Sequence, residues 1–149
     1  MKRKYLKWAM PFIVVLFIMI VPIITRTINN DIAYQTAQDV KAIALPDKTE
    51  YVEMFSAAGK LVGNGNGMQY LGGILIKSEL PIDSIRAYYS QYASNEWEYL
   101  VDKQDGNYIQ FIEHGEVPLH TNVDGDNFYI VYSWGQSNSF LTEFDARGH

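Results

Sequence analysis

The sequence predicts an α+β protein, with an N-terminal transmembrane helix followed by a small antiparallel sheet and one packed amphipathic helix. Three observations support this prediction. Residues 8–25 form an uncharged apolar stretch, residues 81–94 have the spacing of an amphipathic helix, and segments with the composition of β-strands lie on both sides of that helix. Strands that precede and follow a single helix are typical of an antiparallel sheet with the helix on one face.

The apolar stretch is long enough to cross a membrane once. Its 18 residues span about 27 Å as a helix, close to the roughly 30 Å of a bilayer's hydrocarbon core. Four basic residues precede the stretch and Arg26 follows it, so the positive-inside rule predicts a cytoplasmic N-terminus and a C-terminal domain outside the cell membrane. One alternative is a cleaved secretory signal, although no Ala-x-Ala site follows the stretch, and another is a buried helix of a soluble protein.

The chain divides into parts of opposite charge. Residues 1–30 contain five basic side chains and no acidic one, whereas residues 31–149 contain seven basic and 17 acidic side chains, which gives +5 and −10. Because the second part repels a phosphate backbone, the sequence predicts no nucleic-acid partner. We expect a basic cytoplasmic stub at residues 1–7, the transmembrane helix at residues 8–25 and a juxtamembrane helix or linker at residues 26–46. An extracytoplasmic α+β domain is expected at residues 47–134, followed by a polar, poorly ordered tail at residues 135–149.

The first elements after the apolar stretch have an ambiguous pattern. A helix or linker is expected to about Asp39, followed by a short strand to Leu45, although an apolar stripe over residues 27–44 also fits a longer helix. Segments 51–57 and 68–77 contain apolar residues bounded by turn formers, and we expect them to pair as neighbouring strands.

The central helix of the domain is predicted over residues 81–94. Pro81 suits the first turn of a helix, and the carboxylate of Asp83 interacts favourably with the N-terminal end of the helix dipole. Apolar residues follow at spacings of three, four and three, at positions 82, 85, 89 and 92.

Two further features are predicted beyond this helix. Residues 97–101 and 108–112 are expected to form a hairpin around the turn at Asp105 and Gly106. Residues 128–134 are expected to form the last strand. Since this strand is apolar on both faces, we expect it in the centre of the sheet or covered on both sides.

A glycine-rich segment at residues 59–67 is the most unusual part of the sequence. Backbone amides in such a segment can bind an anion, so we consider a possible ligand loop that consists of Gly63, Asn64, Gly65, Asn66 and Gly67. The segment matches neither nucleotide-binding pattern, because Leu61 follows Lys60 where a P-loop has Ser or Thr, and Met68 replaces the third glycine of the dinucleotide fingerprint. A turn with positive φ angles is the favoured interpretation.

No motif predicts an enzyme, a cofactor or a metal site. Residues 122–127 match only the first half of an EF-hand loop, because Asn127 occupies its glycine position and Ser133 its glutamate position. Four candidate metal ligands in a predicted solvated loop match no zinc spacing: Glu113, His114, Glu116 and His120. The chain has no cysteine and no Gly-x-Ser-x-Gly motif, which leaves paired carboxylates as an open catalytic arrangement.

Three strings of residues lie between Lys60 and Ser90: Gly63-Asn-Gly-Asn-Gly-Met-Gln-Tyr70, Leu75-Ile-Lys-Ser78 and Ala87-Tyr-Tyr-Ser90. Together they resemble uncharacterised small single-pass membrane-anchored proteins of Gram-positive bacteria, a resemblance that implies the same topology and no activity. The anchor, the 14% of aromatic residues and the lack of a catalytic set predict a binding or accessory domain for an envelope protein or polymer. The alternatives are an envelope hydrolase with paired carboxylates and a ligand sensor that acts through a membrane partner.

Overall fold

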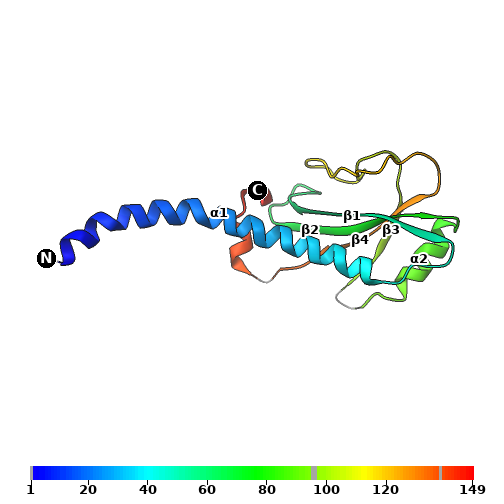
Figure 1. The fold of residues 1–149 in the computed structure, drawn as a ribbon, viewed down its shortest axis with the longest axis horizontal. Helices are drawn as coiled ribbons and strands as arrows, with labels where there is room; N and C mark the ends of the chain where they lie inside the picture. The colour runs from blue at the N-terminus through cyan, green and yellow to red at the C-terminus, as the bar shows by residue number, and fades with distance from the viewer. Residues whose placement is uncertain (1, 95–96, 138) are drawn as a thin grey trace.

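The computed structural model describes the backbone of residues 2–94, 97–137 and 139–149 and, within these ranges, the side chains from residue 10 onward. A long helix packs with its second half on a four-stranded antiparallel sheet (Figure 1). The elements are α1 (Lys2–Ala42), β1 (Thr49–Gly59), β2 (Gln69–Ser78), α2 (Ile82–Ser90), β3 (Leu100–Lys103), β4 (Phe128–Gly135) and the 3-10 helices η1 (Phe140–Phe144) and η2 (Ala146–Gly148). The predicted α+β fold class is confirmed.

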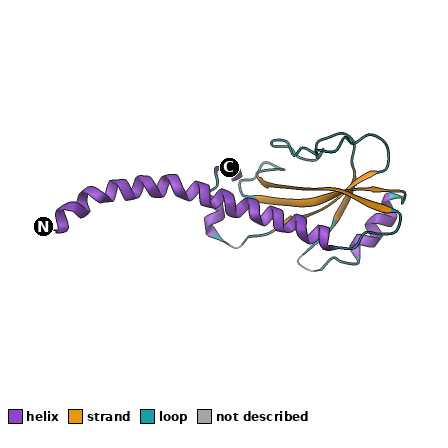
Figure 2. Ribbon diagram, viewed as in Figure 1, coloured by secondary structure: helices purple, strands orange, loops and turns teal. Residues whose placement is uncertain are grey.

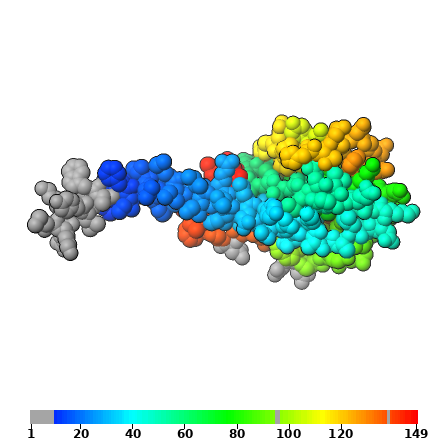
Figure 3. All heavy atoms as spheres, in the orientation of Figure 1, coloured from blue at the N-terminus to red at the C-terminus, as the bar shows by residue number. Residues whose placement is uncertain are grey.

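Helix α1 has an exposed first half and a buried second half. Most apolar side chains between Met10 and Ile24 are exposed, and this part of the helix projects from the rest of the molecule as a stalk (Figure 3). By contrast, Ala33, Ala37 and Val40 are at most 1% exposed. Among the described residues, α1 is the one helix that is long and apolar enough to cross a membrane.

Helix α1 continues to Ala42, so the predicted strand from residue 40 to residue 45 is wrong. The buried positions 33, 36, 37 and 40 have the spacing of one helix face, and Val40 enters the same core as Ile74 and Tyr89. The helical period therefore prevails over the short alternation of apolar residues that favoured a strand.

The sheet has the order β1-β2-β4-β3, and each neighbouring pair is antiparallel. As predicted, β1 and β2 are neighbours. Helices α1 and α2 pack on one face, and the connection over residues 104–127 packs on the other (Figure 2). The two apolar sides of β4 enter two different cores, which confirms both its central position and its cover on both sides.

The predicted hairpin of residues 97–101 and 108–112 is wrong. Strand β3 pairs with β4, and residues 108–112 take part only in an isolated bridge between Tyr108 and Pro118. The chain turns at Gly106, whose φ is +75°, but then crosses to the other face of the sheet. Val101 and Ile109 consequently lie in different cores. Helix α2 ends at Ser90, earlier than the predicted residue 94.

Helix α1 approaches the sheet closely because glycine occupies two contact points. A Cβ atom on Gly72 of β2 would lie 2.7 Å from the carbonyl oxygen of Ala33 and would overlap the backbone nitrogen of Ala37. On β4, a Cβ atom on Gly135 would overlap the hydroxyl of Thr36. The helix backbone therefore rests directly on β2 at Gly72, whereas at Gly135 the missing Cβ leaves room for the side chain of Thr36.

The tail, predicted to be poorly ordered, is instead folded against α1. Thr142 and Asp145 are at most 4% exposed. The side-chain amide of Asn29 donates to the carbonyl oxygen of Thr142 at 3.1 Å and to Asp145 Oδ2 at 3.0 Å. These contacts join residues 113 and 116 positions apart, so the local sequence pattern contains no sign of them.

Removal of the Tyr89 hydroxyl is expected to leave the free energy of unfolding unchanged or to raise it by up to about 1 kcal/mol. Tyr89 is fully buried, its hydroxyl has no hydrogen-bond partner among the described residues, and burial raises its pKa to about 12. Tyr70→Phe is the matched control, because the Tyr70 hydroxyl donates to Asn29 Oδ1 at 3.2 Å and its loss is expected to cost about 1–2 kcal/mol. Urea titration in detergent micelles compares Tyr89→Phe with this control, and equal losses would contradict the prediction.

Candidate functional site

The two edges of the sheet differ in how well they are covered. At the β3 edge, Arg86 Nε donates to the carbonyl oxygen of Val101 at 3.0 Å, and the guanidinium lies 3.4 Å from Asp102 Oδ1. Strand β1 is 11 residues long, and among the described residues the backbone of residues 50–58 has no hydrogen bond to any segment except β2. One side of β1 therefore presents unpaired amide and carbonyl groups.

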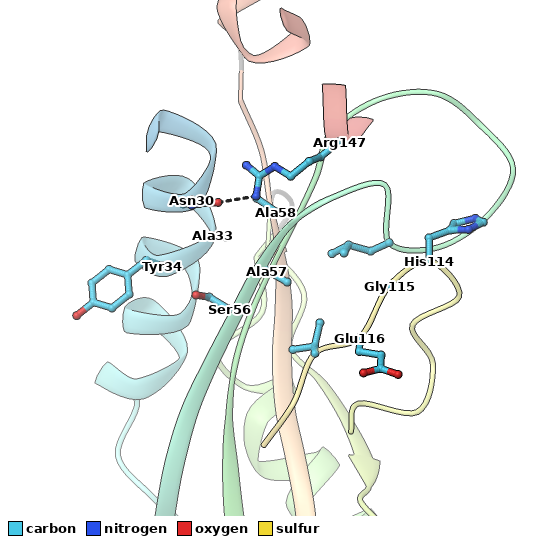
Figure 4. A pocket seen from close by; sticks show the side chains of 12 residues that line it. Asn30, Ala33, Tyr34, Ser56, Ala57, Ala58, His114, Gly115, Glu116 and Arg147 are labelled. Carbon is cyan, nitrogen blue, oxygen red and sulfur yellow. Dashed lines mark hydrogen bonds between the residues drawn. The ribbon is translucent and has the colours of Figure 1, made fainter. Parts of the chain in front are cut away.

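A groove of about 440 Å³ lies along this open edge. Figure 4 shows its two walls, with Asn30, Ala33 and Tyr34 of α1 on one side and the loop residues His114–Glu116 on the other. Because α1 and this loop cover opposite faces of the sheet, a hollow lined by both lies at the outer edge of β1. Ser56, Ala57 and Ala58 form its floor.

Hydrogen bonds hold the polar side chains around the groove in place. Arg147 Nη1 donates to Asn30 Oδ1 at 2.9 Å, and its Nη2 lies 2.6 Å from Asp145 Oδ2, which neutralises its charge. On the opposite wall, His114 Nε2 lies 2.8 Å from the carbonyl oxygen of Gly63. The walls are therefore formed before any ligand binds.

The floor of the groove suits an extended polypeptide. The short side chains of Ser56, Ala57 and Ala58 leave the backbone of β1 accessible from the side. A strand that pairs there rises about 3.3 Å per residue and needs only main-chain hydrogen bonds to bind. Glu116 is the one carboxylate among the residues that line the groove, so these residues do not contain a pair of catalytic acids.

The glycine loop is fastened to the rest of the chain at both ends. The Gly63 amide donates to Glu113 Oε2 at 2.7 Å, and the Gly67 amide donates to the carbonyl oxygen of Gly148 at 2.7 Å. Their φ angles are +75° and +136°, which confirms the predicted turn with positive φ. Asn64, Gly65 and Asn66, the rest of the possible ligand loop, are exposed and do not line the groove.

The candidate metal ligands do not come together. Among the described residues, no three His, Cys, Asp or Glu side chains are grouped so that they could hold a metal ion. Glu113 binds the Gly63 amide, while the backbone of His120 donates to Glu53 Oε2 at 3.1 Å. In the segment that resembles half an EF-hand, Asp126 forms an ion pair with Lys103 at 2.7 Å.

Of the residues that line the groove, the sequence pattern singles out only His114 and Glu116, and it does so as candidate metal ligands. Tyr34 and Asn30 belong to a helix that continues the apolar stretch, and Arg147 belongs to the segment predicted to be a poorly ordered tail. The edge position and full length of β1 appear only in the structure, because the sequence predicts a strand over residues 51–57 and indicates no strand order.

The chain was compared with protein-family models, with curated proteins and with solved structures, and none of the three comparisons gives a match. No relative therefore suggests an activity or a ligand. The groove, the open edge of β1 and the apolar half of α1 are the features that bear on function.

Proposed function

We propose that the protein is a single-pass membrane protein with a cytoplasmic N-terminus, and that its outer domain is a binding module of the cell envelope. Its groove holds an extended segment of another envelope protein, which adds as a strand to the edge of β1. The observation that carries this proposal is the unpaired side of β1, whose residues Ser56, Ala57 and Ala58 form the floor of a preformed groove. The β3 edge, in contrast, is covered by Arg86.

Charge favours a polypeptide over an anionic polymer as the partner. Residues 31–149 carry a net charge of −10, and one of their negative charges, that of Glu116, lies on the wall of the groove. Because like charges repel across an interface, a neutral or basic segment is the better partner. A hydrolase with paired carboxylates gains no support, since the lining residues supply one carboxylate only.

Photo-crosslinking tests this proposal with two matched tyrosines. Tyr34 lines the groove and is 44% exposed, whereas Tyr92 follows α2, away from the groove, and is 45% exposed. With a photoreactive phenylalanine in place of either residue, we expect a crosslinked envelope protein from position 34 and none from position 92 in intact cells. Equal crosslinks from both positions, or crosslinks at position 34 only to a second copy of the chain, would contradict the proposal.

Substitution of Ser56 by arginine is expected to lower the yield of that crosslink by about tenfold or more, equivalent to about 1.4 kcal/mol. Ser56 is exposed on the floor of the groove, so the longer side chain occupies the space of the incoming strand while the fold is retained. Ser90→Arg is the control, because Ser90 is also an exposed serine, on α2 away from the groove, and the change in charge is the same. A similar decrease for both variants would assign the effect to charge alone.

A further inference from the structure

The 3-10 helix η1 lies beside the end of the apolar stretch of α1. Asn29 binds the carbonyl oxygen of Thr142, in the middle of η1, and Thr25, one turn earlier on α1, is only 1% exposed. Figure 1 shows η1 against α1 at the end of the domain nearest the stalk. Residue 25 is also the last residue of the uncharged run, so η1 packs where a membrane span would end.

Two phenylalanines of η1 point away from the protein. Phe140 is 74% exposed and Phe144 is 57% exposed, which makes them the two most exposed large hydrophobic side chains outside α1 among the described residues. Their rings form an edge-to-face pair with centroids 6.2 Å apart. Two adjacent phenylalanine rings form no hydrogen bonds with water. Their joint exposure therefore indicates a surface that contacts another apolar surface.

The depth of this pair matches the interfacial layer of a bilayer. From Thr25 to Asn29 α1 rises about 6 Å, and the headgroup layer outside the hydrocarbon core is about 5–8 Å thick on each side. Aromatic side chains are enriched in this layer. Glu143, which precedes Phe144 in η1, is also exposed, and its charge favours a position among the headgroups over deeper insertion.

We propose that Phe140 and Phe144 insert into the interfacial layer of the outer leaflet, so that η1 is a second membrane contact beside the span. A lipid surface is the occupant because η1 is bound to α1 at Asn29, one turn beyond the exposed apolar residues Ile23 and Ile24 that the proposed span places in lipid. The contact fixes the orientation of the domain relative to the bilayer. This inference rests on the membrane anchoring in the proposed function.

Single-cysteine variants of the full chain test the contact, because the sequence has no cysteine of its own. A nitroxide label is attached at position 140, 144, 16 or 51 in turn, with one protein in each phosphatidylcholine nanodisc. Leu16 lies in the middle of the apolar stretch. Tyr51 is 41% exposed, and the centroid of its ring lies 4.8 Å from Lys41 Nζ. Since Lys41 follows Thr25 by 16 residues of α1, Tyr51 marks a level about 24 Å further along the helix.

The measured quantity is the collision rate of each label with oxygen, which dissolves in lipid, relative to that with a water-soluble nickel complex. We expect the ratio at positions 140 and 144 to be several-fold higher than at position 51 and lower than at position 16. If 140 and 144 match 51 while 16 is lipid-exposed, the η1 contact is overturned and the anchor stands. If position 16 also matches 51, the anchor and the η1 contact are both overturned. Unchanged thermal midpoints of the labelled variants establish that each is folded.

Discussion

Replacement of Gly72 by alanine is expected to lower the free energy of unfolding of the domain by about 3 kcal/mol or more. The added Cβ would overlap the backbone nitrogen of Ala37 and lie 2.7 Å from the carbonyl oxygen of Ala33. Backbone atoms of a helix cannot rotate away as a side chain can, so α1 as a whole has to move off the sheet. That movement would open the core around Ile74 and Tyr89.

Gly65→Ala is the control for this substitution. Gly65 lies in the exposed glycine loop, where an added Cβ would have no heavy atom within 4 Å, and its φ is not in the left-handed region. Urea titration in detergent micelles, followed by tryptophan fluorescence, measures both variants. We expect Gly65→Ala to change the free energy of unfolding by less than about 0.5 kcal/mol. A Gly72→Ala variant as stable as this control would show that α1 does not pack against β2 as described.

Substitution of Asp145 by asparagine is expected to cost about 2 kcal/mol at neutral pH. The side chain of Asp145 is 5% exposed and accepts hydrogen bonds from Asn29 and from the guanidinium of Arg147. Burial alone would raise the pKa of Asp145, but these hydrogen bonds outweigh it and lower the pKa to about 2. An asparagine keeps the shape and loses the charge that holds Arg147.

The same pKa predicts how stability changes with pH. Since the folded-state pKa is below the ordinary value of 3.8, the carboxylate contributes its full stabilisation above about pH 4 and loses it as the pH falls toward 2. The stability advantage of the wild type over Asp145→Asn should therefore shrink between pH 4 and pH 2. Asp124→Asn, at an exposed aspartate, serves as the control for the change in charge. A difference that is constant with pH would contradict the assigned pKa.

The predictable elements are those whose burial repeats along the chain. Strand β4 alternates between two cores, and Ile85 and Tyr89 of α2 are both buried at a helical spacing, so each pattern appears in the sequence alone. The partner of β3 was not predictable in this way. It depends on the face of the sheet to which the chain crosses after Gly106, and this is decided by the packing of Ile109 against distant residues.

The candidate site was harder to predict than the fold. The glycine loop attracted attention because of its composition, yet the amides of Gly63 and Gly67 are already bound within the chain. The groove combines α1, β1, the loop over residues 114–117 and Arg147, and no local pattern relates these four segments. Asn29 donates hydrogen bonds to Thr142 and Asp145 of the tail. In the sequence it is only a polar residue within the apolar segment 27–44, which gives no sign of these contacts.

The continuity of α1 gives the groove a set height above the bilayer in the proposed orientation. The helix runs without a break from the apolar stretch to Tyr34, which lies nine residues beyond Thr25, a rise of about 13 Å. An extended chain covers that distance in about four residues. In this orientation, a partner that also spans the membrane reaches the level of β1 with the first few residues outside its own span. The length of α1 thus favours partners inserted in the same membrane.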